Sequence, residues 1–118
     1  MAVDNDAVED IFKEVRDEYQ AELKSWLVVL LEEMAKIAPS QPGADLGTYI
    51  ERIREITHKI AGSSGSFGFK EVSQTALPVE KLCIEISKGG VGLSPENMVA
   101  LTGLITTLQR AIENPQIS

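Results

Sequence analysis

His58 is the residue of this chain best suited to nucleophilic or proton-transfer chemistry, and it is the only histidine among 118 residues. With a single cysteine, Cys83, and no second histidine, the chain lacks the ligands of a zinc site, so we predict no metal site. A Ser-His-acid triad is not indicated either. Ser63 and Ser64 follow on the same segment as the histidine, and no G-x-S-x-G elbow is present. No Gly-rich ATP-binding loop appears. The chemistry that remains is nucleophilic attack by the imidazole itself, with a partner supplying the other reacting groups.

The helix expected around His58 places its imidazole on the surface. Apolar residues from Leu46 to Ile60 recur with helical spacing and lie within about 60° of Ile53 on a helical wheel, whereas His58 lies at about 140°. Gly62 is four residues further on and therefore stacks beside His58. Gly62 either clears the surface so that a second protein can approach the ring, or it only marks the helix end, where Gly62 or Gly65 can serve as the C-cap.

Four amphipathic helical segments and no strand account for the apolar pattern. We predict helices at about 4–37, 44–62, 70–87 and 94–112. Four such helices with short connections are typical of an all-α, antiparallel up-down four-helix bundle, and 118 residues fit a single domain over 1–118.

Some details of these helices can also be predicted. The first contains no Pro or Gly and would be roughly 50 Å long, so it either overhangs the bundle or breaks near 17–21. Pro78 lies inside the third helix and should kink it. Ser94 and Pro95 have the residue types of an N-cap and a first helical position.

Composition restricts the partners and the location. The net charge of −7 argues against nucleic acid as the main partner. The N-terminus does not resemble a signal peptide, and the longest apolar run, Trp26 to Leu31, is too short to span a bilayer. We therefore expect a cytoplasmic protein that does not enter membranes. We also expect a monomer, because one intramolecular bundle would account for the apolar stripes. Cys83 lies in an apolar helical run and is expected to be buried.

Charge is unevenly distributed along the chain. Residues 1–33 contain ten acids and three bases, a balance of −7, whereas residues 51–70 contain two acids and four bases, a balance of +2. The segment around His58 is thus locally basic on an acidic protein. This suits a site that meets an acidic partner or a phosphoryl group, although ordinary scatter of surface charge is an equally simple interpretation.

The stretch from Thr57 to Glu80, THKIAGSSGSFGFKEVSQTALPVE, resembles the signature of histidine phosphotransfer (HPt) domains. That signature has a histidine, an aliphatic residue two positions on, a glycine at four, small residues at five and six, a hydrophobic–Gly pair at nine and ten, and spaced aliphatics ending in an acid. The matching positions are His58, Ile60, Gly62, Ser63, Ser64, Phe67, Gly68, Val72, Val79 and Glu80. The Gly65 to Phe69 stretch is similar to the phosphoacceptor domains of chemotaxis kinases.

This resemblance implies a phosphorelay function. His58 would accept a phosphoryl group from, and donate it to, an aspartate of a response-regulator receiver domain, and a histidine kinase is a second implied partner. The receiver would bring Mg²⁺, and the chain would need no cofactor of its own. The chain would be a phosphotransfer intermediate without an ATP site, either free-standing or excised from a larger chemotaxis-type kinase, so whether it should be called an enzyme is open.

The resemblance also implies roles for neighbouring residues. Glu80 would accept a hydrogen bond from Nδ1–H of His58 and fix its tautomer, or it is a plain surface acid. Ser63 or Ser64 would bind the phosphoryl group, or would only satisfy the helix end. Phe67 and Phe69 are expected to cap the core below the site rather than to contact a partner.

One position departs from the family pattern. The family often has a lysine three residues after the histidine, where this chain has Ala61. Lys59 and Arg54 are the nearby cations, and we expect Lys59 to substitute. The missing lysine leaves a second interpretation open, in which the bundle docks a receiver or kinase without being phosphorylated.

Overall fold

A computed structural model describes residues 5–37, 46–89 and 93–115, and this part of the chain is helical without any strand. The elements are α1 (Asn5–Ile37), α2 (Leu46–Ser63), a short 3₁₀ helix η1 (Ser64–Phe67), α3 (Lys70–Lys88) and α4 (Pro95–Glu113). The predicted all-α class is therefore confirmed, and every helix end within the described ranges lies within two residues of its prediction. The predicted starts at 4 and 44 and the 39–43 loop lie outside those ranges.

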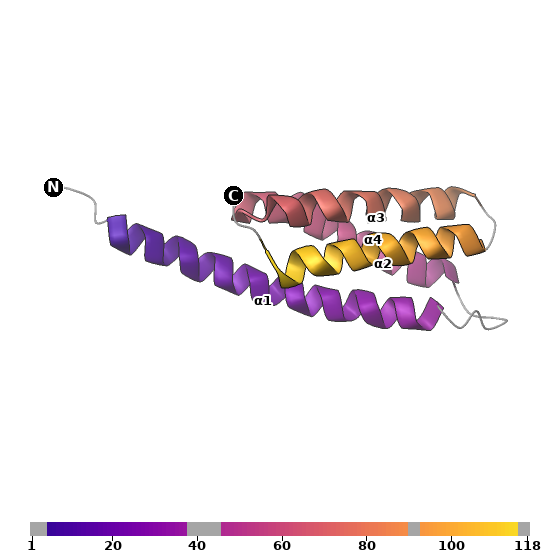
Figure 1. The fold of residues 1–118 in the computed structure, drawn as a ribbon, viewed down its shortest axis with the longest axis horizontal. Coiled ribbons are helices and arrows are strands. Elements are labelled where there is room, and N and C mark those ends of the chain that lie inside the picture. The colour runs from indigo at the N-terminus through magenta and orange to yellow at the C-terminus, as the bar shows by residue number, and fades with distance from the viewer. Residues whose placement is uncertain (1–4, 38–45, 90–92, 116–118) are drawn as a thin grey trace.

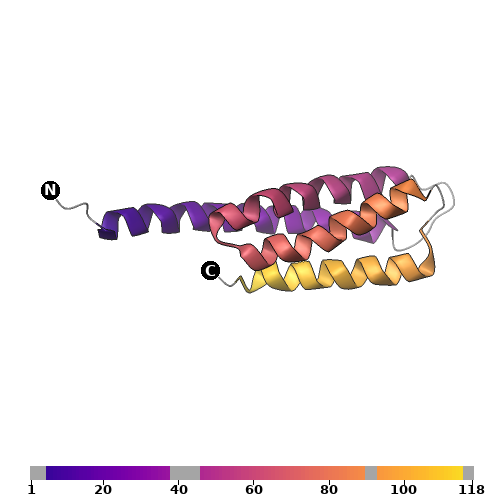
Figure 2. The same cartoon turned by 90° about the horizontal axis from the view of Figure 1, so that it is seen from above.

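The four helices lie side by side, and the chain reverses direction from each helix to the next (Figures 1 and 2). α1 and α3 each pack against both α2 and α4. No Cα atoms of α2 and α4 lie within 8 Å of each other, so these two helices occupy diagonal corners of the bundle. The outward face of α2 is consequently bordered by α1 on one side and α3 on the other.

A continuous apolar core holds the helices together, because each helix turns one stripe inward. Fully buried aliphatic side chains come from all four helices: Leu23 and Leu30, Ile53 and Ile60, Val72 and Val79, Leu101 and Leu108. Full burial of each such side chain contributes about 1.5–3 kcal/mol. Cys83 is also buried, as predicted, and its burial raises the pKa of the thiol to about 12, so it is neutral at ordinary pH.

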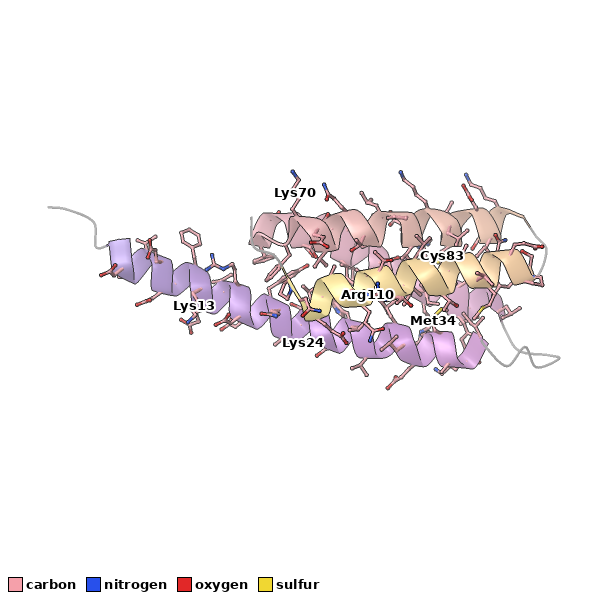
Figure 3. All side chains as sticks on the ribbon, in the orientation of Figure 1. Lys13, Lys24, Met34, Lys70, Cys83 and Arg110 are labelled. Atoms are coloured by element: carbon pink, nitrogen blue, oxygen red, sulfur yellow. The ribbon has the colours of Figure 1, made fainter. Side chains whose placement is uncertain are left out.

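The first helix is continuous and overhangs the bundle. α1 has 33 residues, 14 more than the 19 of α3 or α4, and its first half extends past the connection between α2 and α3 (Figures 1 and 2). Lys13 lies on this projecting part in Figure 3, whereas Lys24 lies where α1 runs along the bundle. The alternative of a break near 17–21 is not observed. The first buried position along the described chain is Tyr19, so the bundle does not cover the apolar stripe before it.

Helix boundaries follow the expected residue types. At the start of α4, Ser94 Oγ accepts a hydrogen bond from the backbone N–H of Asn97 at 3.1 Å, and Pro95 occupies the first turn, as predicted. α3 continues through Pro78 without a break. No helix in the described residues is both long enough and apolar enough to cross a bilayer.

Candidate functional site

His58 lies on the outward face of α2, about one turn before that helix ends, and its side chain is 70% exposed. The preceding residue, Thr57, is fully buried and donates its hydroxyl hydrogen bond to the carbonyl of Ile53 at 2.8 Å. The inward stripe of α2 thus fixes the helix rotation, and His58 must point outward. The predicted exposure of His58 is confirmed.

Glu80 of α3 orients the imidazole. Its carboxylate oxygen Oε2 lies 2.5 Å from Nδ1 of His58, and the Glu80 side chain is only 14% exposed. In the neutral ring this contact is a hydrogen bond donated by Nδ1–H, which leaves the lone pair on Nε2. Nε2 makes no hydrogen bond to any residue in the described ranges. His58 is therefore an exposed imidazole whose Nδ1 contacts a carboxylate and whose Nε2 has no partner among the described residues.

Arg54 is the cation on the same side of α2 as this pair. Its guanidinium Nε donates to both carboxylate oxygens of Glu51, at 3.0 and 2.9 Å. This hydrogen bonding raises the pKa of Arg54, and attraction to Glu51, Glu55 and Glu80 adds to it. The same contact lowers the pKa of Glu51. The guanidinium is therefore close enough to interact electrostatically with the Glu80 carboxylate, and it remains positively charged.

Lys59 lies on the other side of the outward face. It is seven residues, or about two turns, after Arg52, so the two share one side of α2. Arg52 reaches Glu33 of α1 at 3.4 Å, which shows that this side borders α1 rather than α3. Lys59 is exposed. Arg54 thus lies on the side of α2 nearer Glu80 of α3, whereas Lys59 lies on the side that borders α1.

Gly62 and Gly65 have no packing neighbours that would exclude a side chain. A Cβ atom added at either position would meet nothing within 4 Å. Gly62 is exposed, and it lies one turn after His58 on the same helix. The interior of this chain therefore does not explain a glycine at 62, and the surface beside the imidazole is open to a partner.

The two serines after Gly62 bind Tyr19 of α1 and are engaged within the fold. Ser63 Oγ donates to the carbonyl of Lys59 at 2.6 Å and lies 2.5 Å from the Tyr19 hydroxyl. Ser64 Oγ lies 3.0 Å from the same hydroxyl and is fully buried. Of the two serines expected either to bind the phosphoryl group or to satisfy the helix end, Ser64 is turned inward by η1 and is buried. Ser63 is half-buried and satisfies the helix end.

A comparison with known protein families matches residues 8–111 to the Hpt domain. The chain belongs to the Hpt family. The match spans most of the chain, including the Thr57 to Glu80 stretch and all four helices of the bundle. No curated protein and no solved structure gives a significant match. The function of the family is histidine phosphotransfer in phosphorelay signalling.

Two further residues of this Hpt domain lie next to the candidate site, Tyr19 against Ser63 and Ser64 and Leu77 one turn before Glu80, and the sequence pattern alone did not indicate either. Tyr19 holds the α2–η1 junction, and its ring stacks on Phe67 with centroids 4.2 Å apart. The sequence clue to Tyr19 is a hydroxyl on an otherwise apolar stripe, because a buried hydroxyl requires a hydrogen-bond partner. Leu77 is a large exposed aliphatic one turn before Glu80, and its signal is an apolar residue outside the inward stripe of α3. Phe69 is buried and Phe67 packs against the core, as predicted for both.

Proposed function

We propose that His58 of this Hpt domain is the phosphoacceptor, and that it exchanges a phosphoryl group with an aspartate of a response-regulator receiver domain. The observation that carries the proposal is the contact between His58 Nδ1 and Glu80 Oε2. It leaves Nε2 as the nucleophilic atom on a side chain that is 70% exposed. A second protein can therefore reach the atom that must react.

The transfer is a single exchange of bonds at phosphorus. The lone pair of Nε2 forms the N–P bond while the P–O bond to the receiver aspartate breaks, and the aspartate leaves as a carboxylate. Nδ1 keeps its proton, so the phosphorylated ring carries positive charge, which the carboxylate of Glu80 offsets through its hydrogen bond. The reverse sequence of bonds returns the phosphoryl group to an aspartate.

The remaining groups act by positioning and by charge. Arg54 is the cation that we assign to the side of the site near Glu80, in place of the lysine that Ala61 replaces. Gly62 and Leu77 provide an open and partly apolar surface for the receiver beside the imidazole. We propose that the receiver supplies Mg²⁺ with its own acidic pocket, so that this chain needs only to present the nucleophile.

A docking module that is never phosphorylated is the second candidate function. Ala61 is the observation that favours it, because an alanine provides no charge for a phosphoryl group. The oriented and exposed state of His58 favours phosphotransfer instead, because docking alone requires neither a buried carboxylate at Nδ1 nor a free Nε2.

The test is transfer of labelled phosphoryl groups from phosphorylated receivers, with Mg²⁺, to the wild-type chain and to His58→Gln. We expect acid-labile, base-stable label on the wild type and none on the variant, with receiver binding retained in both. Circular dichroism of both proteins controls for folding. Binding without label on the wild type across a panel of receivers would instead support the docking module.

A further inference from the structure

The projecting half of α1 carries an apolar stripe that the bundle does not cover. Ile11 and Phe12 are 60% and 61% exposed, and Val8 and Val15 are also exposed. These four residues follow the spacing i, i+3, i+4 and i+7, so they share one side of the helix. The stripe continues directly into Tyr19 and Leu23, which are buried in the bundle. The projecting half thus presents a core-type face beyond the end of the core.

The charged residues of this segment are arranged with the same period. On a helical wheel, Glu9 and Arg16 lie along one edge of the stripe, seven residues apart and opposite in charge. Asp10 and Asp17 lie on the opposite side of the helix, away from the stripe.

We propose that this stripe pairs with the same stripe of a second copy, with the two projecting segments antiparallel. A two-fold axis near Phe12 brings the apolar stripes together and places Glu9 of each copy opposite Arg16 of the other. Antiparallel pairs match like edges, so the opposite charges meet twice. In a parallel pair, the edge that carries Glu9 and Arg16 would instead face the edge of the second copy that carries Ile11 and Glu18. No positive charge would then face Glu9.

The length of the projection fits this arrangement. Residues 5–18 cover about 21 Å of helix, and a two-fold axis near Phe12 brings Asn5 of one copy level with Tyr19 of the other. The overlap therefore ends where each bundle begins. The four exposed side chains provide on the order of 300 Å² of apolar surface per copy, below the usual size of a stable interface, so we expect a dissociation constant on the order of 100 µM.

The test is sedimentation equilibrium of the whole chain over a wide concentration range. We expect reversible dimers, and at least about tenfold weaker association for Glu9→Arg and for Arg16→Glu, because each puts like charges opposite one another. An equimolar mixture of the two variants should recover dimers at the wild-type concentration, because each Arg then meets a Glu. Asp10→Arg and Lys13→Glu make the same charge changes away from the proposed contact edge and should not weaken association.

Three results would overturn the proposal: a monomer at all concentrations, single variants that associate as the wild type does, or a mixture that does not recover. If the stripe becomes covered only when a receiver is added, pairing with a second copy is likewise rejected, and the surface is assigned to the receiver. The measurement needs no phosphoryl transfer, so it stands apart from the function proposed for His58.

Discussion

At the scale of single residues, the contact between Glu80 and Nδ1 of His58 leaves Nε2 as the exposed ring nitrogen that the proposed transfer uses. The Glu80 side chain is 14% exposed, and its hydrogen bond to Nδ1 is charge-assisted because the acceptor is a carboxylate. The sequence predicted this pair through the family pattern. It did not predict that Arg54 rather than Lys59 lies on the side of α2 nearer Glu80, because that depends on which side of α2 borders α3.

Replacing Glu80 by Gln should slow phosphoryl acceptance at His58. The amide can still accept a hydrogen bond, but the negative charge that offsets the phosphorylated ring is lost, and a charge-assisted bond contributes about 1.5–3 kcal/mol. We expect transfer from a phosphorylated receiver to fall by about tenfold or more, as measured by rapid quench. Glu85→Gln makes the same change at an exposed position of α3 and should transfer at the wild-type rate.

Replacing Gly62 by Gln should block the approach of the receiver without harming the fold. The added side chain meets nothing in this chain, and glycine costs a helix interior about 1 kcal/mol relative to alanine, so the thermal midpoint should hold or rise. Transfer and receiver affinity should fall by about tenfold or more. Gly103→Gln on α4 is the matched control, since it is also open and α4 lies diagonally across from α2. Equal transfer by the two variants would contradict a docking surface at Gly62.

At the scale of elements, the corner between α2 and α3 is the part that the sequence described least well. The predicted helices at 44–62 and 70–87 left 63–69 as a connection, but α2 continues through Ser63 and is followed by η1. Gly68 then has a φ of 88°, and its N–H donates to the carbonyl of Gly65 at 3.2 Å. Helical periodicity fixes the long helices, whereas this corner depends on a hydrogen bond between Ser64 and the hydroxyl of Tyr19, which is 45 residues earlier in the chain. Local sequence patterns cannot report such a contact.

Gly68→Ala should destabilise the fold, because a left-handed backbone conformation costs a residue with a Cβ atom about 1–2 kcal/mol. Urea unfolding should show a corresponding loss in the free energy of unfolding. Gly65→Ala lies in the same corner at an open position without a positive φ, and it should be neutral within about 0.5 kcal/mol. A loss of the same size in both variants would mean that the corner tolerates no substitution, rather than that Gly68 requires its φ.

At the scale of the whole molecule, the chain consists of a compact bundle and a helical projection. The sequence predicted the four helices and their boundaries but left open whether the first one overhangs or breaks. Its apolar stripe is uniform from Val8 to Ile37, so the answer depends on the shorter lengths of α3 and α4, 19 residues each. We expected a monomer because one bundle would cover every apolar stripe. The bundle does not cover the stripe on the projecting half of α1.

The division into bundle and projection predicts a contrast between two substitutions on α1. Leu23→Ala removes a fully buried side chain and should lower the free energy of unfolding by about 2–5 kcal/mol. Ile11→Ala removes a side chain that is 60% exposed and should change it by no more than about 0.5 kcal/mol in dilute solution. Urea unfolding of both variants is the measurement. A large loss for Ile11→Ala would contradict a projecting first half of α1.

We propose that Glu80 holds Nδ1 of His58 so that Nε2 receives the phosphoryl group. Because the chain has a single histidine, ¹⁵N-histidine labelling gives one pair of ring signals, and NMR can follow both nitrogens before and after transfer from a phosphorylated receiver. We predict a proton on Nδ1 and none on Nε2 in the free neutral ring, and a phosphorus coupling to Nε2 afterwards. A neutral ring protonated at Nε2, or phosphorus on Nδ1, would contradict the account.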